Sequence, residues 1–596
     1  MSTSVAHMLF NTIAQYPDKD VLIYKRDGKL RSLTYHEFGE RIRRLTHAMA
    51  DIGLLAGDRI GILSNNRPEW PISDFATFCL RGVVVPVYQT LPANQIAYIL
   101  NDAEVRAIFV ENEEQLQKIR EIKKDLPKLD FIFTYDRISD EVLEPIAFDD
   151  LIERGNGHIE KHASFFNDSL NRIQPKEICS LVYTSGTTGE PKGVMLHHHG
   201  FMADIVESEA VLDLQPDDVF LSFLPLSHLY ERLGGHWCPM YKGCTLFYAQ
   251  SIDTVVADIA EAQPTVMVSV PRLYEKIATA VIDQVESGSS LKKKIFYWAL
   301  DTGMKYHQRK YDGKVPALLE KKYQLADKLA FSKIKTKLGG RFRFPIAGGA
   351  PLSVETLKFF EAIGLKIVEG YGMTESHLII TLTPPGRFKY GSCGKPIKGV
   401  EVKVADDGEV LVRGDIVMAG YYKKPELTAE VIDKDGWLHT GDVGFLDSDD
   451  FLFLTDRKKN IIVTSGGKNI ATAPLENRLK TSRYIDDVCL IGNQRKFISA
   501  LIVPNVENLG KWAAEHGLES GEITRLVRED KVNELINDEI ERLQEDFARF
   551  EKVKKFEILP EPFSIEKGEL TPSLKVKKDV VQDHYRSVID TLYEEG

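Results

Sequence analysis

Apolar and polar residues in the N-terminal part of the chain alternate between the spacing of strands and the spacing of helices. Residues 33–53 have the helical pattern: Thr34 and Glu37 can form a capping box, Gly53 ends the segment, and one face carries Phe38, Ile42, Leu45, Met49 and Ile52. Short apolar runs that suit buried strands follow at 60–63, 83–87 and 107–110, with helical stretches between them. Strands that alternate with helices predict a parallel sheet covered by helices.

A segment rich in hydroxyl groups and glycines lies between two further apolar runs, 178–183 and 194–196. Glycine permits close backbone approach, so successive N–H groups can converge on an anion. The candidate phosphate-binding residues are Thr184, Ser185, Gly186, Thr187, Thr188, Gly189 and Lys192. Gly193 follows the lysine where the helix-opening loop of many nucleotide-binding proteins has Ser or Thr, which predicts a loop between two strands. The alternative is a Ser/Gly-rich surface loop.

Residues 344–376 have the pattern of a β–α–β unit. A strand at 344–347 leads to a helix that Ser353 can cap, and a second strand is expected at 366–368. Ligands of such sheets bind beyond the carboxyl ends of the strands, where the chain places Gly348, Gly349, Ala350, Glu369, Gly370, Tyr371, Gly372, Thr374 and Glu375. Tyr371 offers a flat face to a base, Thr374 a hydroxyl to a phosphate, and Glu375 a hard oxygen ligand to Mg²⁺. The alternative is a tight turn with a surface Thr-Glu pair.

From about residue 392 the pattern changes to short strands and hairpins, such as 400–412 around an Asp-Asp-Gly turn. Asp442 follows a tight glycine turn and could hold a ribose diol. Residues 456–460 form a charged link that is a candidate hinge. A small α+β domain is expected beyond it, with an amphipathic helix at 531–550 and strands near 461–464, 487–491, 498–503 and 554–559.

Two further segments suggest binding surfaces. The strand at 219–224 leads into His228 and Arg232, and Trp237 nearby suggests a pocket wall; the alternative is that His228 is structural. Residues 285–335 are rich in lysine and helical, which is typical of a solvated face. The run Lys292–Lys294 beside Phe296–Trp298 could also contact a membrane surface.

Composition narrows the class of protein. A length of 596 residues predicts two or more domains, and a net charge of −12 argues against a general nucleic-acid binder. The six cysteines have no metal-ligand spacing, which suits a reducing compartment. The sequence shows no signal-peptide pattern and no apolar run that could span a membrane. We expect a cytoplasmic protein, and the sequence leaves open peripheral contact with the inner face of the membrane and a homodimer.

Together these segments resemble the adenylate-forming (AMP-binding) superfamily, from about residue 8 to about residue 590. Four motifs stand in the family's order, at 184–193, 371–375, 440–442 and 456–459. Within the superfamily, the segments 224–232, 263–266 and 270–276 are similar to those of the long-chain fatty acyl-CoA synthetases, also called long-chain-fatty-acid–CoA ligases.

The resemblance implies an α/β fold. A large N-terminal domain of mixed and parallel sheets with flanking helices would include a distorted β-barrel-like subdomain, and a small mobile α+β domain would follow. The implied domains are 1–457, for nucleotide and acyl binding, and 458–596, for the catalytic lysine and the CoA face. The implied activity is a ligase of fatty acid metabolism that converts ATP, fatty acid and CoA to acyl-CoA, AMP and pyrophosphate through an acyl-adenylate. The C-terminal domain would rotate between the two half-reactions.

The resemblance also implies roles for individual residues. The catalytic set is Lys575, Glu375, Thr184 and Lys192, with Mg²⁺ on Glu375 as the cofactor. Tyr371 would stack on adenine, Thr374 would contact the α-phosphate, Asp442 would bind the ribose and Arg457 would assist at ribose or phosphate. The acyl pocket would include His228, Arg232, Gly348 and Gly349. Ser465, Gly466 and Gly467 would approach CoA, and Lys459 would be the hinge.

One departure from the family pattern affects the catalytic lysine. Many members have Ser-Gly-Lys where this chain has Ser573-Leu574-Lys575, so Lys577 or Lys578 could replace Lys575. Several alternatives also remain for the whole protein: a fatty acyl-AMP ligase that loads a carrier protein, a medium-chain or aryl acid–CoA ligase, an amino-acid-activating enzyme, and a nucleotide sensor without activity.

Overall fold

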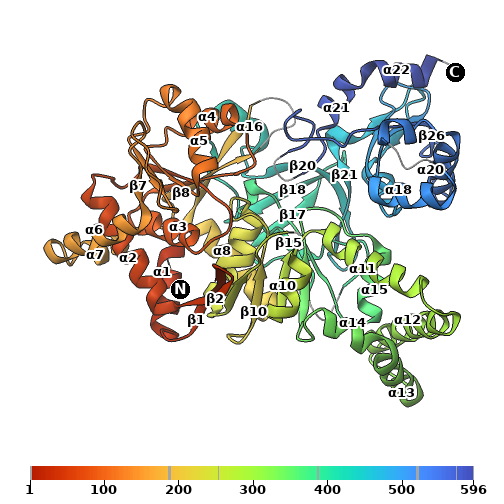
Figure 1. Cartoon of the computed structure of the whole chain (residues 1–596), viewed down its shortest axis with the longest axis horizontal. Helices are drawn as coiled ribbons and strands as arrows, with labels where there is room; N and C mark the ends of the chain where they lie inside the picture. Colours follow the sequence, from red (N-terminus) through yellow and green to blue (C-terminus); the bar gives the residue numbers. More distant parts are fainter. Residues whose placement is uncertain are drawn as a thin grey trace. The chain divides into compact units, whose positions relative to one another are not determined.

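The computed structural model describes residues 3–184, 190–252, 254–384, 388–518, 522–571 and 574–594. The chain divides into two compact units (Figure 1). The first comprises residues 1–402, 412–438 and 450–452, and the second comprises residues 403–411, 439–449 and 453–596. The predicted residues Ser185, Gly186, Thr187, Thr188 and Gly189 lie outside the described residues.

The first unit contains a sheet in the order β19-β9-β8-β4-β3-β5-β6-β7 among the described residues. Its strands are β3 (Arg59–Leu63), β4 (Val83–Val87), β5 (Ala107–Val110), β6 (Phe131–Thr134), β7 (Ile146–Ala147), β8 (Ile178–Thr184), β9 (Lys192–His197) and β19 (Gly420–Tyr421). The strands from β8 to β7 are parallel, whereas β9 pairs antiparallel with both β8 and β19. The predicted strands at 60–63, 83–87 and 107–110 are confirmed.

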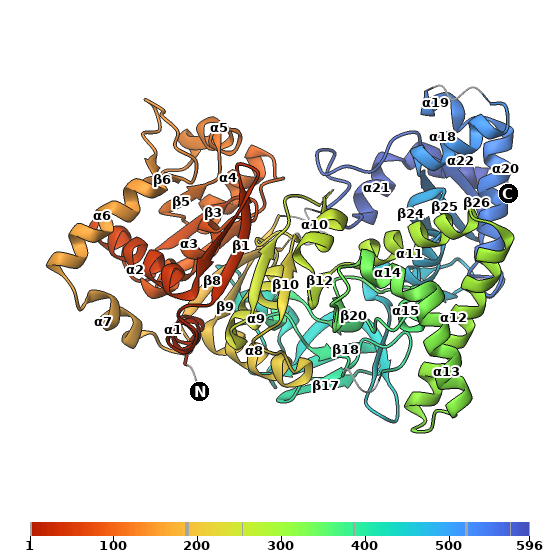
Figure 2. The ribbon, with the colours of Figure 1, turned by 60° about the horizontal axis from the view of Figure 1, so that its bottom comes forward.

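Helices cover both faces of this sheet (Figure 2). On one side lie α2 (Tyr35–Asp51), α3 (Glu69–Cys79) and α6 (Phe148–Lys161), and on the other lie α4 (Ala93–Asp102) and α5 (Glu113–Ile122). The predicted capping box of α2 is confirmed, because Thr34 accepts from the Glu37 N–H while Glu37 accepts from the Thr34 N–H. The apolar faces of α4 and α5 pack on strand residues such as Val85 and Ile108.

A second sheet of the same unit has the order β16-β15-β14-β13-β12-β10-β11-β1-β2. Its strands are β1 (Asp20–Arg26), β2 (Lys29–Thr34), β10 (Val219–Ser222), β11 (Thr245–Tyr248), β12 (Val266–Ser269), β13 (Phe344–Ala347), β14 (Val368–Tyr371), β15 (Thr381–Leu382) and β16 (Lys395–Pro396). The strands from β1 to β14 are parallel along this order. This order brings the predicted β–α–β ends of β13 and β14 side by side.

The second strand of the predicted β–α–β unit lies further along the chain than expected. The prediction was a strand at 366–368 with Glu369 beyond its end, but β14 comprises Val368–Tyr371. Glu369 pairs with Ala347 of β13, and Tyr371 pairs with Thr381 of β15. These pairs extend the strand to Tyr371, and the partner of Tyr371 lies in the two-residue strand β15, which no local sequence pattern indicates. The predicted helix cap is confirmed, since Ser353 caps α15 (Val354–Ala362).

Several helices pack on the second sheet. They are α10 (Val255–Ala262), α11 (Pro271–Glu286), α12 (Ser290–Tyr311), α13 (Ala317–Ala326) and α14 (Ser332–Lys337), with the π-helical segment η3 (Asp327–Phe331) between the last two. One buried cluster joins Phe296 of α12, Phe331 and Phe360 of α15 to Met267 of the sheet. The first unit also contains α1 (Val5–Gln15), α7 (Phe165–Arg172), α8 (His198–Leu212), α9 (Cys238–Lys242), α16 (Pro425–Val431) and the π-helical segment η2 (Tyr230–Trp237).

The predicted hairpin region forms a sheet in the order β17-β18-β20-β21. Its strands are β17 (Val400–Val404), β18 (Glu409–Gly414), β20 (Leu438–Leu446) and β21 (Leu452–Arg457). This sheet corresponds to the β-barrel-like part of the predicted fold, and residues 403–411, 439–449 and 453–457 of it belong to the second unit.

The remainder of the second unit is a small α+β body, as the sequence predicts. Its strands are β22 (Ile462–Val463), β23 (Asn469–Ile470), β24 (Ile485–Ile491), β25 (Ile498–Pro504) and β26 (Val553–Ile558), and its helices include α17 (Ala473–Leu479), α18 (Val506–Glu515), α20 (Asp530–Leu543), α21 (Lys578–His584) and α22 (Arg586–Glu594). The prediction of a helix at 531–550 is wrong at its end. Gln544 stops α20, because its side-chain amide bonds both the N–H and the carbonyl of Val553 and so ties the chain to β26.

No helix among the described residues has the length and apolar character that crossing a membrane requires.

Candidate active site

The mouth of the β8–β9 hairpin carries the first predicted site residues. Thr184 and Lys192 are direct partners across this antiparallel pair, so the described strands hold both ends of the predicted phosphate loop together. The strand–loop–strand arrangement predicted from Gly193 is therefore confirmed for the residues that flank the loop. The side chain of Lys192 extends to a tyrosine from a distant part of the chain, with its Nζ 5.1 Å from the centre of the Tyr421 ring.

Tyr421 joins Lys192 to the predicted Mg²⁺ ligand. The Tyr421 hydroxyl donates a hydrogen bond of 2.9 Å to Oε1 of Glu375, while the ring lies below the Lys192 ammonium. Burial first, and then the Glu375 carboxylate, raise the pKa of Tyr421, so the hydroxyl stays a donor. The cation and the carboxylate are thus held on opposite parts of one aromatic side chain.

Backbone hydrogen bonds fix Tyr421 in this position. The N–H of Met418 donates to the carbonyl of Glu375 at 2.9 Å, and the N–H of Tyr422 donates to the carbonyl of Gly193 at 2.8 Å. The short strand β19 therefore connects the Glu375 turn to β9. Tyr421 is not apparent as a site residue from the sequence, because no local pattern marks a two-residue strand whose partners lie far away in the chain.

The turn that contains Glu375 is followed by a buried histidine, His377, whose structural role is also not apparent from the sequence. His377 is 0% exposed; its Nε2 accepts from the His197 N–H at 3.0 Å and its Nδ1 donates to the Ile416 carbonyl at 2.6 Å. Burial lowers the pKa of His377 to about 3, so the ring is neutral and carries its proton on Nδ1. A side chain at Gly200 would collide with the ring, since its Cβ would lie 2.4 Å from Nε2.

The adjacent strand ends require glycine for close backbone approach. A Cβ on Gly372 would lie 1.3 Å from the carbonyl oxygen of Leu378, and a Cβ on Gly348 would lie 2.9 Å from the Tyr230 ring. Gly349 has a φ of 81°, and it and Ala350 are exposed just beyond β13. Because β13 and β14 are parallel neighbours, the predicted residues at their carboxyl ends lie together at one edge of the sheet.

Glu369 is the strongly perturbed carboxyl group in this region. Burial raises its pKa to about 8, although the Leu352 N–H donates to it and acts in the opposite direction. Gly370 and Tyr371 continue the strand beyond it, and the 3₁₀ turn η4 (Thr374–Ser376) follows. Glu369 thus enters the site region largely protonated at neutral pH, so Glu375 is the better candidate for a cation ligand.

His228 and Arg232, predicted together for the acyl pocket, lie in different environments. His228 is half-buried, and its Nδ1 accepts from the Tyr230 N–H at 3.0 Å. Arg232 is 1% exposed; its guanidinium forms a two-point ion pair with Asp74 and donates to Ser180 at 2.8 Å. An acyl chain could reach Arg232 only if this ion pair opened, so the structure gives Arg232 a stabilising position in the interior.

Aromatic rings enclose the same guanidinium. Trp237 lies 4.7 Å from its central carbon, and Trp70 and Phe78 each lie at 5.5 Å. Trp237, which the sequence analysis placed in a pocket wall, is itself 1% exposed. The aromatic side chains and the ion pair form one buried cluster.

A second buried polar group, the carboxyl group of Glu231 in η2, lies next to this cluster. Glu231 is 0% exposed, and within the described residues neither of its carboxylate oxygens has a hydrogen-bond partner. Burial raises the pKa of Glu231 to about 8, with the nearby Ser222 hydroxyl acting against the shift. The ring of His236 stacks on Tyr248 at 5.4 Å and its Nε2 lies 3.2 Å from Ser222. With a pKa raised to about 8 by burial, Glu231 is mostly protonated at neutral pH.

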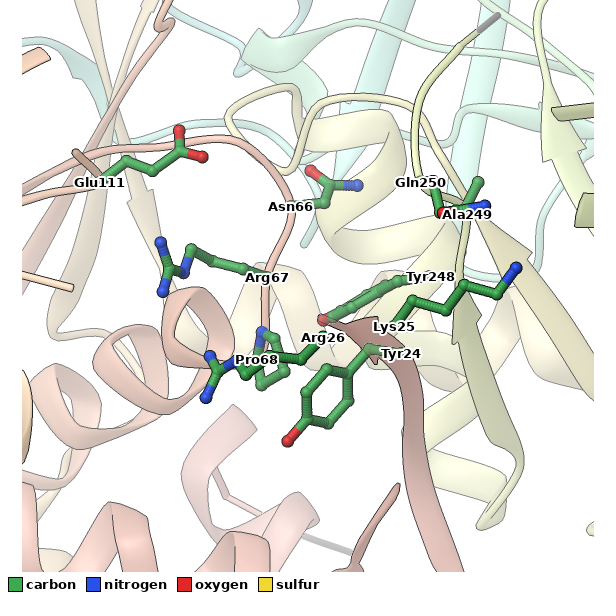
Figure 3. A pocket seen from close by; sticks show the side chains of 10 residues that line it. All are labelled: Tyr24, Lys25, Arg26, Asn66, Arg67, Pro68, Glu111, Tyr248, Ala249 and Gln250. Carbon is green, nitrogen blue, oxygen red and sulfur yellow. The ribbon is translucent and has the colours of Figure 1, made fainter. Parts of the chain in front are cut away.

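A pocket of about 190 Å³ lies near this group, outside the predicted site (Figure 3). Lys25, Arg26 and Arg67 line it, and Figure 3 shows Lys25 directed away from the two arginines. Both arginines pair with Glu69, and Lys25 pairs with Glu261. Because carboxylates compensate these cations, the pocket lacks the uncompensated charge that would attract an anion.

The second unit holds the predicted ribose-binding pair. Oδ1 of Asp442, a residue that is 6% exposed, lies 3.1 Å from Nε of Arg457. Asp442 follows Gly441, which has a φ of 69°, and its N–H donates to the Thr440 hydroxyl at 3.1 Å. The predicted glycine turn is wrong, because Gly441 and Asp442 lie within β20; the positive φ of Gly441 is instead a local irregularity of that strand.

Lys575 also belongs to the second unit, and Arg457 and Asp442 both affect its pKa. Loss of water around the ammonium lowers the pKa of Lys575, Arg457 lowers it further, and Asp442 acts in the opposite direction. Leu574 has a φ of 60° and is 61% exposed, so it adopts at this position the left-handed conformation that glycine adopts without strain. Pro572 and Ser573 lie outside the described residues.

The alternatives to Lys575 differ in their surroundings. Lys578 forms an ion pair of 2.8 Å with Glu476 and also donates to the Thr472 hydroxyl, so its charge is used inside the second unit. Among the described residues, no ion pair comparable to that of Lys578 engages Lys575 or Lys577. Lys575 remains the better candidate for the catalytic lysine.

The predicted hinge and CoA segments are both short turns. Lys458 begins η5 (Lys458–Asn460), which also contains Lys459, and pairs with Asp407 at 2.6 Å and Glu409 at 3.1 Å. Ser465, Gly466 and Gly467 form the exposed turn between β22 and β23, and Gly467 has a φ of 73°. A Cβ at Gly466 would meet nothing closer than 3.9 Å, so the surface of this turn is open.

The residues present fit a Mg²⁺ ion that is shared with a substrate. No group of three or more His, Cys, Asp or Glu side chains within the described ranges could form a dedicated metal cage. Mg²⁺ bound through one carboxylate and substrate phosphates needs no such cage, and Glu375 keeps one oxygen that Tyr421 does not contact.

The sequence identifies the protein family that this geometry suggests. A profile of AMP-binding enzymes matches residues 9–422, and a profile of the C-terminal domain of AMP-binding enzymes matches residues 459–596. The chain therefore belongs to the AMP-binding enzyme family.

Individual relatives narrow the similarity. Long-chain-fatty-acid–CoA ligase FadD15 of Mycobacterium bovis is 33% identical over 600 residues, which cover 99% of this chain and 97% of that protein. Long-chain-fatty-acid–CoA ligase 1 of Homo sapiens is 33% identical over 96% of this chain and 83% of its own length.

Solved structures show the same fold. The adenylation domain of a carboxylate reductase from Mycobacterium chelonae has a TM-score of 0.75 at 22% identity and covers 99% of this chain and 91% of that chain. The anthranilate CoA ligase AuaEII in complex with anthranoyl-AMP has a TM-score of 0.73 at 20% identity and covers 98% of both chains. The predicted fold class of a large α/β domain with a smaller C-terminal domain is confirmed.

Proposed function

We propose that the chain is a long-chain-fatty-acid–CoA ligase that forms an acyl-adenylate from ATP and a fatty acid and then transfers the acyl group to CoA. The observation that carries the proposal is the 33% identity, over 99% of the chain, to a relative named for this activity. The convergence of Lys192 and Glu375 on Tyr421 supplies matching chemistry for a polyphosphate.

In the first half-reaction a fatty acid carboxylate oxygen would attack the α-phosphorus of ATP, and the bond to the bridging oxygen would break to release pyrophosphate. Both reactants are anions, so the protein must mainly neutralise charge and position them. Lys192, Thr184 and the loop from Ser185 to Gly189 would hold the β- and γ-phosphates, and Thr374 would contact the α-phosphate. A Mg²⁺ ion on Glu375 would supply further neutralisation of the phosphate oxygens.

Other predicted residues would hold the rest of the nucleotide. Tyr371 would stack on adenine beside Gly349, Ala350, Glu369, Gly370 and Gly372. Asp442 would accept from the ribose hydroxyls, and its 3.1 Å contact with Arg457 supports this assignment because it orients the carboxylate. Lys575 would bridge the carboxylate and the phosphate.

In the second half-reaction the CoA thiolate would attack the acyl carbon and AMP would leave with the electrons of the broken acyl–phosphate bond. We propose that residues 1–457 and 458–596 act as two domains and that Lys459 is the pivot between them. Rotation would withdraw Lys575 and bring Ser465, Gly466 and Gly467 to the pantetheine arm, where glycines leave room.

The acyl chain would enter near His228, Gly348 and Gly349. Because its guanidinium is buried in an ion pair with Asp74, we propose that Arg232 stabilises the protein interior near the pocket and does not contact the fatty acid. Gly348 packs against the Tyr230 ring, which adds Tyr230 to the residues that can shape the acyl site.

The test is CoA-dependent release of AMP, measured across fatty acids of increasing chain length. We expect turnover with long-chain acids in the presence of free CoA. AMP release that needs a carrier protein would identify a fatty acyl-AMP ligase, and a preference for medium-chain or aryl acids would identify those ligases. Nucleotide binding without any turnover would overturn the proposal.

Two finer expectations accompany this function. A homodimer and peripheral contact with a membrane are both compatible with the sequence, and a nucleic-acid partner is not expected from the net charge of −12. Peripheral contact would suit an enzyme whose acid substrate partitions into lipid.

A further inference from the structure

Positive charge is concentrated in one helical segment of this acidic protein. Residues 290–337 contain thirteen lysines and arginines but four aspartates and glutamates, whereas the whole chain has a net charge of −12. The segment comprises α12, α13, η3 and α14. We refer to residues 290–331, which comprise α12, α13 and η3 and hold ten of these basic residues and all four acidic ones, as the basic hairpin. In both views the basic hairpin extends beyond the sheet strands of its own unit (Figures 1 and 2).

The same hairpin exposes large apolar side chains. Leu318 is 67% exposed, Leu325 49% and Leu329 47%. The first two are seven residues apart on α13 and Leu329 follows four residues later, so the three share one helix face. Lys321 and Lys322 lie between the first two leucines and are exposed. This arrangement of leucines flanked by lysines is typical of helices that lie in a membrane interface.

The inner face of the hairpin is packed, so the exposed leucines do not reflect loose structure. A Cβ on Gly303 of α12 would lie 2.2 Å from the carbonyl oxygen of Ala362, which shows how closely α12 packs on α15. Tyr306 of α12 and Tyr323 of α13 stack with ring centres 4.0 Å apart and an interplanar angle of 3°. The hairpin therefore presents a fixed outer face.

We propose that the outer face of the basic hairpin binds the surface of membranes that contain anionic lipids. The charge is complementary: several lysines at an anionic surface each add affinity, and the exposed leucines can insert among the acyl chains. The inference rests on the proposed function, because docking at a bilayer would place the enzyme where its fatty acid substrate accumulates.

The test is co-sedimentation of the full-length protein with phosphatidylcholine vesicles that contain or lack phosphatidylglycerol. We expect binding to the anionic vesicles and much weaker binding to phosphatidylcholine alone. Lys321→Gln with Lys322→Gln should lower the partition coefficient about 25-fold, because each lysine near an anionic surface contributes about a fivefold factor. Leu318→Ser with Leu325→Ser should lower it at least as strongly.

Matched controls lie outside the hairpin. Leu55 is 64% exposed and Lys128 is exposed, so Leu55→Ser and Lys128→Gln should leave vesicle binding unchanged. All variants should retain acyl-CoA synthesis from dissolved fatty acid without vesicles, which separates failure of docking from failure of the proposed activity.

Equal binding of wild-type and hairpin variants would overturn the proposal, as would the absence of binding to anionic vesicles. A change of oligomeric state in the leucine variant, without vesicle binding by the wild type, would identify the face as a contact between copies of this chain and would also overturn it.

Discussion

The buried pair of Arg232 and Asp74 offers the sharpest test of how the interior is held together. The perturbation is Arg232→Met, which keeps a long apolar side chain against Trp237 but removes the charge. Asp74, which is 0% exposed, would then remain buried without its cation. The substitution therefore isolates the charge from the packing.

The expected cost follows from burial and geometry. Arg232 contacts Asp74 through two nitrogens, one of which lies 3.0 Å from Oδ2, and both side chains are almost inaccessible to water. Removing one partner of a buried ion pair costs about 3–5 kcal/mol, because the other charge stays desolvated. Replacing both partners, as Asp74→Leu with Arg232→Met, should recover most of this loss.

The assay is urea unfolding of the wild type, both single variants and the double variant, followed by tryptophan fluorescence. Trp70 and Trp237 lie beside the guanidinium and report on this part of the first unit. Chain-length preference should be measured on the folded variants as a second readout. We expect it to stay unchanged in Arg232→Met, because the guanidinium contacts the interior and not the acyl chain.

Two results would refute this reasoning. A loss of less than about 1 kcal/mol in Arg232→Met would mean that the pair contributes no more than an exposed ion pair. A shifted chain-length preference with unchanged stability would instead place Arg232 in contact with the fatty acid.

Three further predictions concern the two half-reactions, the hydrogen bond to Glu375 and the pH dependence of stability. Lys575→Ala should abolish adenylate formation but spare thioester formation from supplied acyl-adenylate, and equal loss of both half-reactions would contradict this division. Tyr421→Phe should lower kcat/KM for ATP about tenfold or more, since it removes a hydrogen bond to the Glu375 carboxylate, whereas Tyr422→Phe should have little effect. Burial raises the pKa of Glu231 from 4.5 to about 8, so the folded state binds more protons than the unfolded state between these values and stability falls as pH rises through this window. Glu231→Gln should lack this fall in stability, which amounts to up to about 1.4 kcal/mol per pH unit. If the urea midpoints of the wild type and of Glu231→Gln change equally between pH 6 and 8, the raised pKa of Glu231 is disproved.

The sequence alone determined the local elements and the order of the motifs. The capping box of α2 and the strands β3, β4 and β5 follow from residues within a few positions of each other, so the local pattern was sufficient. The strand–loop–strand character of the phosphate segment followed from the single residue after Lys192. The motif order also led to the correct family and fold class.

The tertiary structure decided which side chains meet. Tyr421 reaches Glu375 across 46 residues, and Arg232 reaches Asp74 across 158 residues. The neighbours of Tyr421 and Asp74 in the chain do not mark either residue as a partner, and neither pairing could be expected from the sequence. Gln544 similarly ends α20 through hydrogen bonds to Val553 that the amphipathic pattern of the helix does not contain. Periodicity reports which face of an element is buried, but only the folded chain shows what that face is buried against.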